Sequence, residues 1–368
     1  MKVALIHDHL AQDGGAEKVL KVLADMFPDA PIYTLLYEKK YADKYFKDRH
    51  IETSIIQRLP GGVKHYQWYM PFMPMAVEFF DLNGFDVVIS DASAFAKGVI
   101  TSSHTLHICY CHTPTRYLWS DTHQYIYDLK YNKYFKKVIS LVLNYIRMWD
   151  KLAADRVDGY IANSRFVAKR IKKYYKREST VIYPPVETDK FKIAEQVGDY
   201  FLIGGRLAPY KRVDLVVEAF KKTNKKLKIY GDGVDLDRLK KIAKGCSNIE
   251  FLGWVDDTAK AELYSRALAF IYPQEEDFGI TAVEAMASGR PVIAYKRGGA
   301  VETVVDGITG LFFNEQTVDS LAQAINNFDN SKFNSEIIRQ HAEKFSVAKF
   351  KNEITKYIED SWENFKNN

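Results

Sequence analysis

Apolar positions along this chain repeat in two ways. Short apolar runs bounded by glycine, proline or polar residues predict buried strands, and apolar residues recurring every three or four positions predict amphipathic helices. The predicted strands are residues 3–6, 86–90, 106–111, 159–162, 180–183, 200–203, 227–230, 249–252, 268–272 and 291–294. The predicted helices are residues 16–27, 213–220, 257–266 and 347–365, with others starting near Ser164, Val234 and Gly279. Such alternation indicates an α/β fold with parallel sheets, whose ligands bind at the carboxyl ends of the strands.

A double proline, Pro184-Pro185, follows the strand predicted at 180–183. Proline stiffens the chain and cannot continue a strand, so we place the crossing between two domains there. At 368 residues the chain is long for one hydrophobic core and suits two. We therefore predict a first domain at 1–184 and a second at 186–346, each a doubly wound, Rossmann-like parallel sheet.

The composition, 47% hydrophobic and 27% charged, is that of a globular protein. No stretch of about 18 uncharged apolar residues exists, and the apolar run at the N-terminus is too short for a secretory signal. Three cysteines are too few for a disulfide framework, and the pair Cys109 and Cys111 is too closely spaced for a zinc site. We expect a cytoplasmic protein.

The charge is unevenly distributed. Residues 1–185 contain 26 Lys and Arg against 19 Asp and Glu, whereas the remainder contains 26 against 28. Aromatic and basic residues interleave at 125–149, and a second basic stripe follows at 169–177. These segments suit peripheral contact with the anionic inner face of a membrane, or they are solvated helix faces. Nucleic acid is a less favoured partner because no nucleic-acid motif is present. The aromatic and methionine-rich stretch 65–75 could form an adaptable surface, but we expect it to close the core beneath a loop.

The stretch 272–287 carries the clearest candidate chemistry. A buried strand ends at Pro273, and Gly279 lies at the start of the next helix. Free backbone N–H groups and the positive end of the helix dipole would form an anion site there. Glu276 and Glu284 flank this site, and their carboxylates could accept hydrogen bonds from sugar hydroxyls. Alternatively, they are a solvated loop acid and a helix surface residue.

Three other strand ends carry candidate groups. Arg206 and Lys211 could clamp a diphosphate, or they are two surface cations. Gly14 and Gly15 lie between a strand and a helix, where glycine lets the backbone approach a phosphate, although such a pair is often only a turn. No third glycine follows at the spacing of a dinucleotide fingerprint. His112 ends a strand, where ligands bind in α/β sheets, or it only hydrogen-bonds its own loop.

The sequence from Glu276 to Ala294 resembles the signature of the retaining glycosyltransferases of family 4. Looser resemblance covers nearly the whole chain, and its other well-matched segments are 205–211, 253–260 and 298–310. The resemblance implies the GT-B fold, in which two Rossmann-like domains face a cleft and a C-terminal helix, here about 347–366, packs back on the first domain. These relatives need no metal ion, so Asp235 and Asp237 are interpreted as acids at the start of a helix rather than as metal ligands.

The resemblance also implies roles for individual residues. Arg206 and Lys211 would hold the diphosphate. Glu276 would bind the sugar hydroxyls and Glu284 the ribose, while His112 would contact the sugar from the first domain. The other residues implied to contact the nucleotide sugar are Gly14, Gly15, Val255, Lys260, Phe278, Gly279, Ile280 and Thr281. Catalysis would rest on Glu276, His112, Arg206 and Lys211, with no protein nucleophile.

The function implied is transfer of a hexose, with retention at the anomeric carbon, from a nucleotide diphosphate sugar. The loop 112–119 resembles that of bacterial O-antigen mannosyltransferases, which favours GDP-mannose over UDP-glucose or a UDP-hexosamine. The acceptor would be a saccharide or a lipid-linked saccharide in polysaccharide or lipopolysaccharide biosynthesis, and no cofactor is implied. A nucleotide-sugar epimerase shares the fold, but its motifs are absent. A nucleotide-binding or lectin-like module without turnover also remains open, whereas an NAD dehydrogenase would need the missing glycine fingerprint.

Overall fold

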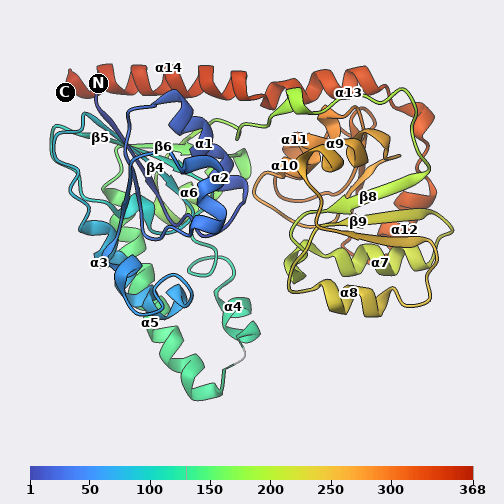
Figure 1. Cartoon of the computed structure of the whole chain (residues 1–368), viewed down its shortest axis with the longest axis horizontal. Coiled ribbons are helices and arrows are strands. Elements are labelled where there is room, and N and C mark those ends of the chain that lie inside the picture. Colours follow the sequence, from blue (N-terminus) through green and yellow to red (C-terminus); the bar gives the residue numbers. More distant parts are fainter. Residues whose placement is uncertain (130, 368) are drawn as a thin grey trace. The chain divides into compact units, whose positions relative to one another are not determined.

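The computed structural model describes residues 1–129 and 131–367, and the chain divides into two compact units. Unit 1 comprises Met1–Tyr183 together with the chain from Lys351 onward, and unit 2 comprises Pro184–Phe350 (Figure 1). The chain therefore enters unit 2 at the double proline and leaves it within its last helix. Each unit has its own sheet and its own buried core.

Within the described residues, unit 1 is built on a seven-stranded sheet in the order β3-β2-β1-β4-β5-β6-β7, with every pair parallel. Its strands are β1 (Val3–His7), β2 (Ile32–Thr34), β3 (Ile51–Thr53), β4 (Val87–Ala92), β5 (Leu106–Cys111), β6 (Gly159–Ala162) and β7 (Thr180–Val181). Strands β1, β4 and β5 are buried along their whole length, as expected for parallel strands covered on both faces.

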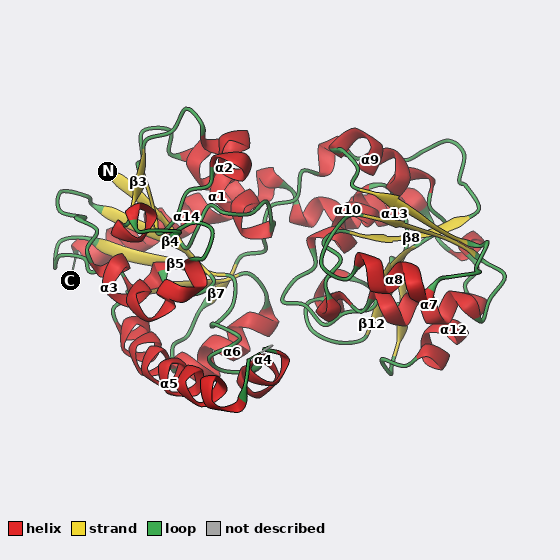
Figure 2. Ribbon diagram, turned by 60° about the horizontal axis from the view of Figure 1, so that its bottom comes forward, coloured by secondary structure: helices red, strands yellow, loops and turns green. Residues whose placement is uncertain are grey.

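The helices of unit 1 lie on both sides of this sheet (Figure 2). They are α1 (Gly15–Met26), α2 (Lys39–Phe46), α3 (Met73–Glu78), α4 (Thr122–Asp128), α5 (Lys133–Asp155) and α6 (Arg165–Tyr175), with the 3₁₀ helices η1 (Ile55–Arg58), η2 (Tyr66–Phe72) and η3 (Ala96–Gly98). Ser164 caps α6 by accepting a hydrogen bond from the N–H of Val167. The last helix, α14 (Val347–Lys366), also packs here, because the hydroxyl of Tyr357 lies where a side chain at Gly159 would be.

Unit 2 has a six-stranded parallel sheet in the order β10-β9-β8-β11-β12-β13. Its strands are β8 (Tyr200–Gly204), β9 (Lys226–Tyr230), β10 (Ile249–Gly253), β11 (Phe270–Tyr272), β12 (Val292–Tyr295) and β13 (Gly310–Phe313). Its helices are α7 (Val213–Lys221), α8 (Leu236–Ile242), α9 (Asp257–Arg266), α10 (Ile280–Ala287), α11 (Ala300–Thr303), α12 (Val318–Asn326) and α13 (Ser335–Ala342), with the 3₁₀ helices η4 (Thr188–Lys190), η5 (Pro209–Lys211), η6 (Asn330–Lys332) and η7 (Glu343–Phe345).

The two strand orders follow the same rule. In each unit the first strand lies between the second and the fourth, so the connections turn to opposite sides at the junction of β1 with β4 and of β8 with β11. At such a switch point the loops diverge and leave a crevice at the carboxyl ends of the strands. The functional groups of this protein should therefore be sought at two places, one in each unit.

Three details differ from or refine the sequence expectations. The stretch 65–75 closes the core only in part: Met73 is buried, but Trp68, Phe72 and Met75 stay exposed because the short helices η2 and α3 turn successive side chains to opposite sides. Cys109 is a buried free thiol in β5. Over residues 1–129 and 131–367, no helix is long and apolar enough to cross a bilayer.

Candidate functional site

The switch point of unit 2 is framed by the loops that follow β8 and β11. After β8 the backbone turns at Gly205, whose φ is +116°, and Arg206 then projects as an exposed side chain. This loop is held by backbone hydrogen bonds, because the N–H of Leu207 donates to Asp232 and the N–H of Asp235 donates to Leu207. The basic side chain therefore stands on a loop whose backbone is fixed from both sides.

Glu276, in the loop after β11, is surrounded by hydrogen-bond donors. Lys211 Nζ makes a close ion pair with Glu276 Oε1, the Tyr272 hydroxyl donates to Oε2 at 2.5 Å, and Gln274 Nε2 lies 3.3 Å from Oε2. Burial opposes ionisation of this carboxyl, but the charge of Lys211 and these hydrogen bonds prevail and lower its pKa. Glu276 is therefore a carboxylate at neutral pH. It can accept hydrogen bonds but cannot donate one.

The helix α10 starts directly after this loop. Gly279, with φ +100°, precedes it, and a side chain there would meet the Tyr272 hydroxyl at 2.6 Å. The first N–H groups of a helix have no intrahelical acceptor. At α10 these are the N–H groups of Ile280 and Thr281. The positive end of the helix dipole reinforces them. Gly279 thus lets three ligand-binding features, a carboxylate, a lysine and a helix N-terminus, approach one another.

Two glycines of a neighbouring loop fix the position of Glu276. The N–H of Gly299 donates to the Glu276 carbonyl at 2.7 Å. A side chain at Gly298 would meet the same carbonyl at 2.4 Å, and one at Gly299 would meet the Phe278 backbone at 2.4 Å. The Phe278 side chain is itself buried against Phe345, so only the backbone of this predicted ligand residue is available to a ligand.

A second lysine–glutamate pair lies one turn into α10. Glu284 is buried, and its Oε1 lies 3.2 Å from Lys260 Nζ on α9. Beneath them, the hydroxyls of Tyr230 and Tyr264 are 2.8 Å apart. Val255 is half-buried in the short loop that joins β10 to α9. The structure joins two pairs of the predicted residues, Lys211 with Glu276 and Lys260 with Glu284. All the predicted residues of unit 2 lie in or after the loops that follow β8, β10 and β11; they are Arg206, Lys211, Val255, Lys260, Glu276, Phe278, Gly279, Ile280, Thr281 and Glu284.

The remaining predicted residues, Gly14, Gly15 and His112, belong to unit 1. Gly14 and Gly15 open α1, and His112 follows β5. His112 Nε2 lies 2.6 Å from Asp91 Oδ1, at the end of β4, and the other oxygen of Asp91 lies 2.8 Å from Nδ1 of His7, at the end of β1. Hydrogen bonds through Asp91 therefore connect His112 to the ends of β4 and β1, the switch point of its own sheet.

The inner part of this cluster is fully buried. His7 Nε2 lies 3.8 Å from Glu17 Oε1 on α1, so His7 stands between two carboxylates. Burial opposes charge on His7, but its hydrogen bond to Asp91 and the negative charges of Asp91 and Glu17 outweigh this effect and raise the pKa of His7 to about 10. The pKa values of Asp91 and Glu17 are lowered despite their burial. His112 and His7 lower the pKa of Asp91, and His7 lowers that of Glu17. The cluster holds an imidazolium and two carboxylates at neutral pH.

The amides after β4 are bound by the protein's own carboxylate. Asp8 accepts hydrogen bonds of 2.6 to 2.8 Å from four consecutive N–H groups, those of residues 93–96. Asp8 follows directly after β1 and is buried. Four charge-assisted hydrogen bonds to one carboxylate make a strong local anchor between the first and fourth strands.

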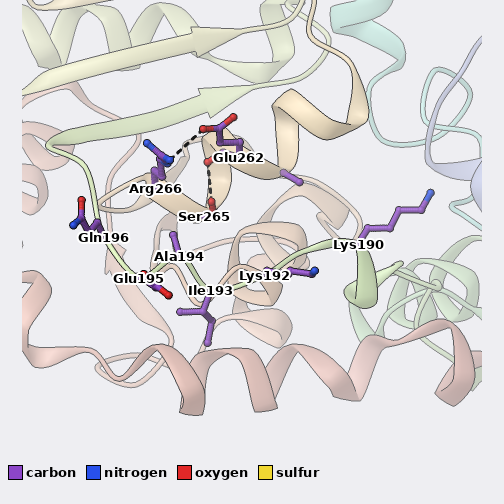
Figure 3. A pocket seen from close by; sticks show the side chains of 10 residues that line it. Lys190, Lys192, Ile193, Ala194, Glu195, Gln196, Glu262, Ser265 and Arg266 are labelled. Carbon is purple, nitrogen blue, oxygen red and sulfur yellow. Dashed lines mark hydrogen bonds and ion pairs between the residues drawn. The ribbon is translucent and has the colours of Figure 1, made fainter.

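A pocket of about 550 Å³ in unit 2 lies apart from these groups (Figure 3). It is bounded by the chain around Lys192 and Glu195 and by the end of α9, where Arg266 is paired with Glu262. It includes none of the predicted site residues. Within the described part of the chain, no group of three or more His, Cys, Asp and Glu side chains could hold a metal ion. Asp235, which precedes α8, is engaged by Arg238 through two hydrogen bonds.

Sequence reasoning missed five members of the two clusters, namely His7, Glu17, Asp91, Tyr272 and Gln274. A signal was present for three of them, because His7, Asp91 and Tyr272 each lie at or next to the carboxyl end of a strand, the rule that singled out His112. Glu17 gave no such signal, since a glutamate in the first turn of a helix is ordinary.

Comparison with known proteins agrees with this geometry. The family model described as "Glycosyltransferase Family 4" matches residues 13–190, and the model "Glycosyl transferases group 1" matches residues 185–360. Together they span both units. The chain belongs to glycosyltransferase family 4. It is therefore a glycosyltransferase that transfers a sugar from a nucleotide sugar, within a family of retaining hexosyltransferases.

Individual family 4 relatives differ in how much of the chain they match. An uncharacterized glycosyltransferase of Methanocaldococcus jannaschii is 30% identical over 58% of this chain and 63% of its own length, just under two thirds. The alpha-1,3/1,6-mannosyltransferase ALG2 of Dictyostelium discoideum is 26% identical over 91% of both chains.

A solved structure of the same fold is that of Anabaena Alr3699/HepE in complex with UDP-glucose. It has a TM-score of 0.72 and 19% identity, and the match covers 98% of this chain and all of that one. The predicted GT-B fold is thereby confirmed.

Proposed function

We propose that this glycosyltransferase moves a hexose, with mannose favoured, from a nucleotide diphosphate sugar to a saccharide or lipid-linked saccharide. The observation that carries the proposal is the grouping at the switch point of unit 2. There Arg206 follows β8, and the ion pair of Lys211 with Glu276 brings this lysine to the loop before α10, so the two cations and the amide end of α10 would bind a diphosphate. The carboxylates of Glu276 and Glu284 flank it, each with its own lysine.

The proposed reaction separates charge, and the site would stabilise that charge. The bond between the anomeric carbon and the diphosphate oxygen breaks, and its electron pair leaves with the diphosphate. The acceptor oxygen bonds to the anomeric carbon on the same face, and its proton passes to the leaving diphosphate. Arg206, Lys211 and the N–H groups of Ile280 and Thr281 would then meet the growing negative charge, which is how preorganised donors lower a barrier.

Glu276 would position the sugar rather than act as an acid. Its low pKa keeps it ionised, so it can accept hydrogen bonds from sugar hydroxyls. Tyr272 and Lys211 hold the carboxylate in place, and a lone pair that they do not use can accept a hydrogen bond from the ligand. Glu284, paired with Lys260, would do the same for the ribose.

His112, in unit 1, is proposed to contact the sugar. Its hydrogen bond to Asp91 determines which ring nitrogen is available to the ligand. An ionised carboxylate only accepts hydrogen bonds, so the His112 nitrogen that faces Asp91, Nε2, carries a proton. The other nitrogen, Nδ1, is left for a ligand. Asp91 is thus a positioning residue for His112, and His112 together with His7 lowers the pKa of Asp91 and keeps it ionised.

The choice of mannose rests on two supports. The loop 112–119 resembles that of bacterial mannosyltransferases, and a relative matched over 91% of both chains is named a mannosyltransferase. UDP-glucose is the second candidate donor, because HepE was crystallised with it. An epimerase of the same fold and a nucleotide-sugar-binding module without turnover are the two alternatives to transfer.

A thermal-shift panel of GDP, UDP, GDP-mannose and UDP-glucose tests the donor, since a ligand at a hundred times its Kd stabilises a protein by about 2.7 kcal/mol. We expect GDP and GDP-mannose to raise the Tm most. Release of the nucleoside diphosphate is then measured with and without a saccharide acceptor. Acceptor-dependent release supports transfer, consumption of the donor without an acceptor supports the epimerase, and binding without release supports the module.

A further inference from the structure

The outer face of α5 is almost entirely apolar. Seven apolar residues of α5 are each more than half exposed, and six of them recur at spacings of four, three, four, three and four, which places these six on one face. They are Tyr134, Val138, Leu141, Tyr145, Met148 and Leu152, here called the α5 stripe. At 1.5 Å per residue the stripe is about 27 Å long. Contiguous exposed apolar surface of this extent marks an interaction site.

A second exposed apolar set adjoins it. Trp68, Phe72, Met75 and Phe79, from η2, α3 and the residue after it, are between 45% and 69% exposed. Glu78 ties this region to α5 by accepting hydrogen bonds from Trp149 and Arg156. Figures 1 and 2 both show α3 beside α5, and α5 reaching beyond the sheet of unit 1.

The charges around the stripe are mainly positive. Lys133, Lys136 and Lys137 lie in the first turns of α5, and Lys151 follows near its end. Residues 101–183 contain 15 Lys and Arg against 6 Asp and Glu. Each of the six acids already has a partner within unit 1; they are Asp121, Asp128, Asp150, Asp155, Asp158 and Glu178. Four of these acids are paired with a lysine or arginine, so the net charge of this segment stays positive.

We propose that the α5 stripe and the adjoining aromatic set lie against an anionic lipid surface. A helix with an apolar face, aromatic residues and lysines at one flank is the form that binds in the plane of a bilayer interface. Lysines near an anionic bilayer each add an attraction that screening by salt weakens. A second copy of this chain would instead bring two positive segments together, which like-charge repulsion opposes. The proposal goes beyond sugar transfer, and lipid binding needs neither donor nor acceptor.

Sedimentation with vesicles tests this surface in the full chain. We use vesicles of phosphatidylcholine alone and of an equal mixture with phosphatidylglycerol. We expect the wild type to bind the mixed vesicles, to bind the neutral ones at least about tenfold more weakly, and to lose binding as salt rises. Equal binding to both vesicles, or none to the mixed ones, overturns the proposal.

Substitutions locate the binding face. The double variant Leu141→Glu with Met148→Glu should bind at least about tenfold more weakly, and Lys133→Gln with Lys137→Gln about tenfold. Ile337→Glu, which alters an equally exposed apolar residue on α13, is the matched control and should bind like the wild type. Unchanged binding of the Leu141 and Met148 variant overturns the proposal, as does a wild-type dimer that this variant dissociates, because the stripe then covers a second copy.

A fluorescent label on Leu141→Cys, with Cys246→Ser as background, provides a test that does not depend on the folding of the charged variants. Its emission should shift to the blue when mixed vesicles are added, as it enters the interface, and an unchanged spectrum contradicts the proposal. The outcome is separable from that of the proposed function. Vesicle binding without any sugar transfer would refute transfer alone, and transfer to a soluble acceptor without vesicle binding would refute docking alone.

Discussion

The two units place opposite charges at the same point of the same strand order. In unit 1 the residue after β1 is Asp8, and its carboxylate occupies the four amides that follow β4. In unit 2 the residues after β8 are Gly205 and Arg206, and the carboxylate of Glu276, in the loop before α10, accepts hydrogen bonds from Lys211 and Tyr272. We propose that the start of α10 in unit 2 binds an anion, whereas in unit 1 the amides of residues 93–96 are bound by Asp8.

This difference is a reason why we propose the nucleotide site at the sheet of unit 2 and not at the sheet of unit 1, although both are doubly wound. The strand order is common to both units, but an anion site needs donors and cations, and the loops after β8 and β11 carry Arg206, Lys211 and the start of α10. Unit 1 uses its buried charges internally, in the cluster of His7, Glu17, Asp91 and His112. The contribution that we predict for unit 1 at the nucleotide-sugar site comes from His112, Gly14 and Gly15.

Glu276→Ala should have the largest effect. We expect the rate of transfer to fall by about 10³-fold, because the sugar loses its positioning carboxylate and Lys211 loses its partner. The Kd for the nucleoside diphosphate should change by less than about threefold, since the diphosphate contacts remain. Steady-state kinetics and calorimetric titration measure the two quantities. Glu275→Ala, an exposed acid next in sequence, is the control, and an equal loss of nucleotide affinity in Glu276→Ala would refute this division of roles.

Arg206→Ala should rank second and differ in kind. Transfer should fall by about 10²-fold, and the Kd for the nucleoside diphosphate should rise by about tenfold, because the guanidinium contacts the diphosphate both before and during the reaction. Arg266→Ala, at the far end of α9, is the matched control. If Arg206→Ala left nucleotide affinity unchanged, the diphosphate would not lie at the loop after β8.

The two units differ in how much of their fold and site could be predicted from the sequence. In unit 2 the strand–loop–helix pattern singled out Arg206, Lys211 and Glu276 at strand ends, and the family resemblance implied that they share one site. The structure joins Lys211 to Glu276. In unit 1 the pairing of His112 with Asp91 could not be predicted, because it depends on strand order. The short strands β2 and β3 were also missed, because three residues give no periodicity. They are strands only through the pairing of β2 with β1 and of β3 with β2.

Asp8→Asn should weaken folding rather than nucleotide binding. An amide can accept at one atom only and turns an N–H₂ toward backbone donors, so about 3 kcal/mol of stability should be lost. Urea unfolding measures the loss, with the exposed Asp13→Asn as control. The Kd for the nucleoside diphosphate should stay as in the wild type. A variant that bound nucleotide more weakly would show that the amides of unit 1 take part in the nucleotide site after all.

His7→Gln should give the smallest effect, and one that depends on pH. Because the folded-state pKa of His7 is about 10, above its ordinary value of 6.5, the folded protein binds this proton more tightly. The resulting stability is fully present below pH 6.5 and disappears as the pH rises through 10. The stability advantage of the wild type over His7→Gln, measured by urea unfolding, should therefore shrink between neutral pH and about pH 10. His50→Gln, at an exposed site, should show no such trend, and a constant difference for His7→Gln would contradict the charged cluster.

The central claim is that the leaving diphosphate binds at the switch point of unit 2. A crystal structure of the full chain with GDP or UDP tests it most directly. We predict density for the diphosphate within hydrogen-bond distance of the N–H groups of Ile280 and Thr281 and of the Arg206 guanidinium. A diphosphate bound instead beside the loops after β1 and β4, or away from the start of α10, would contradict the account.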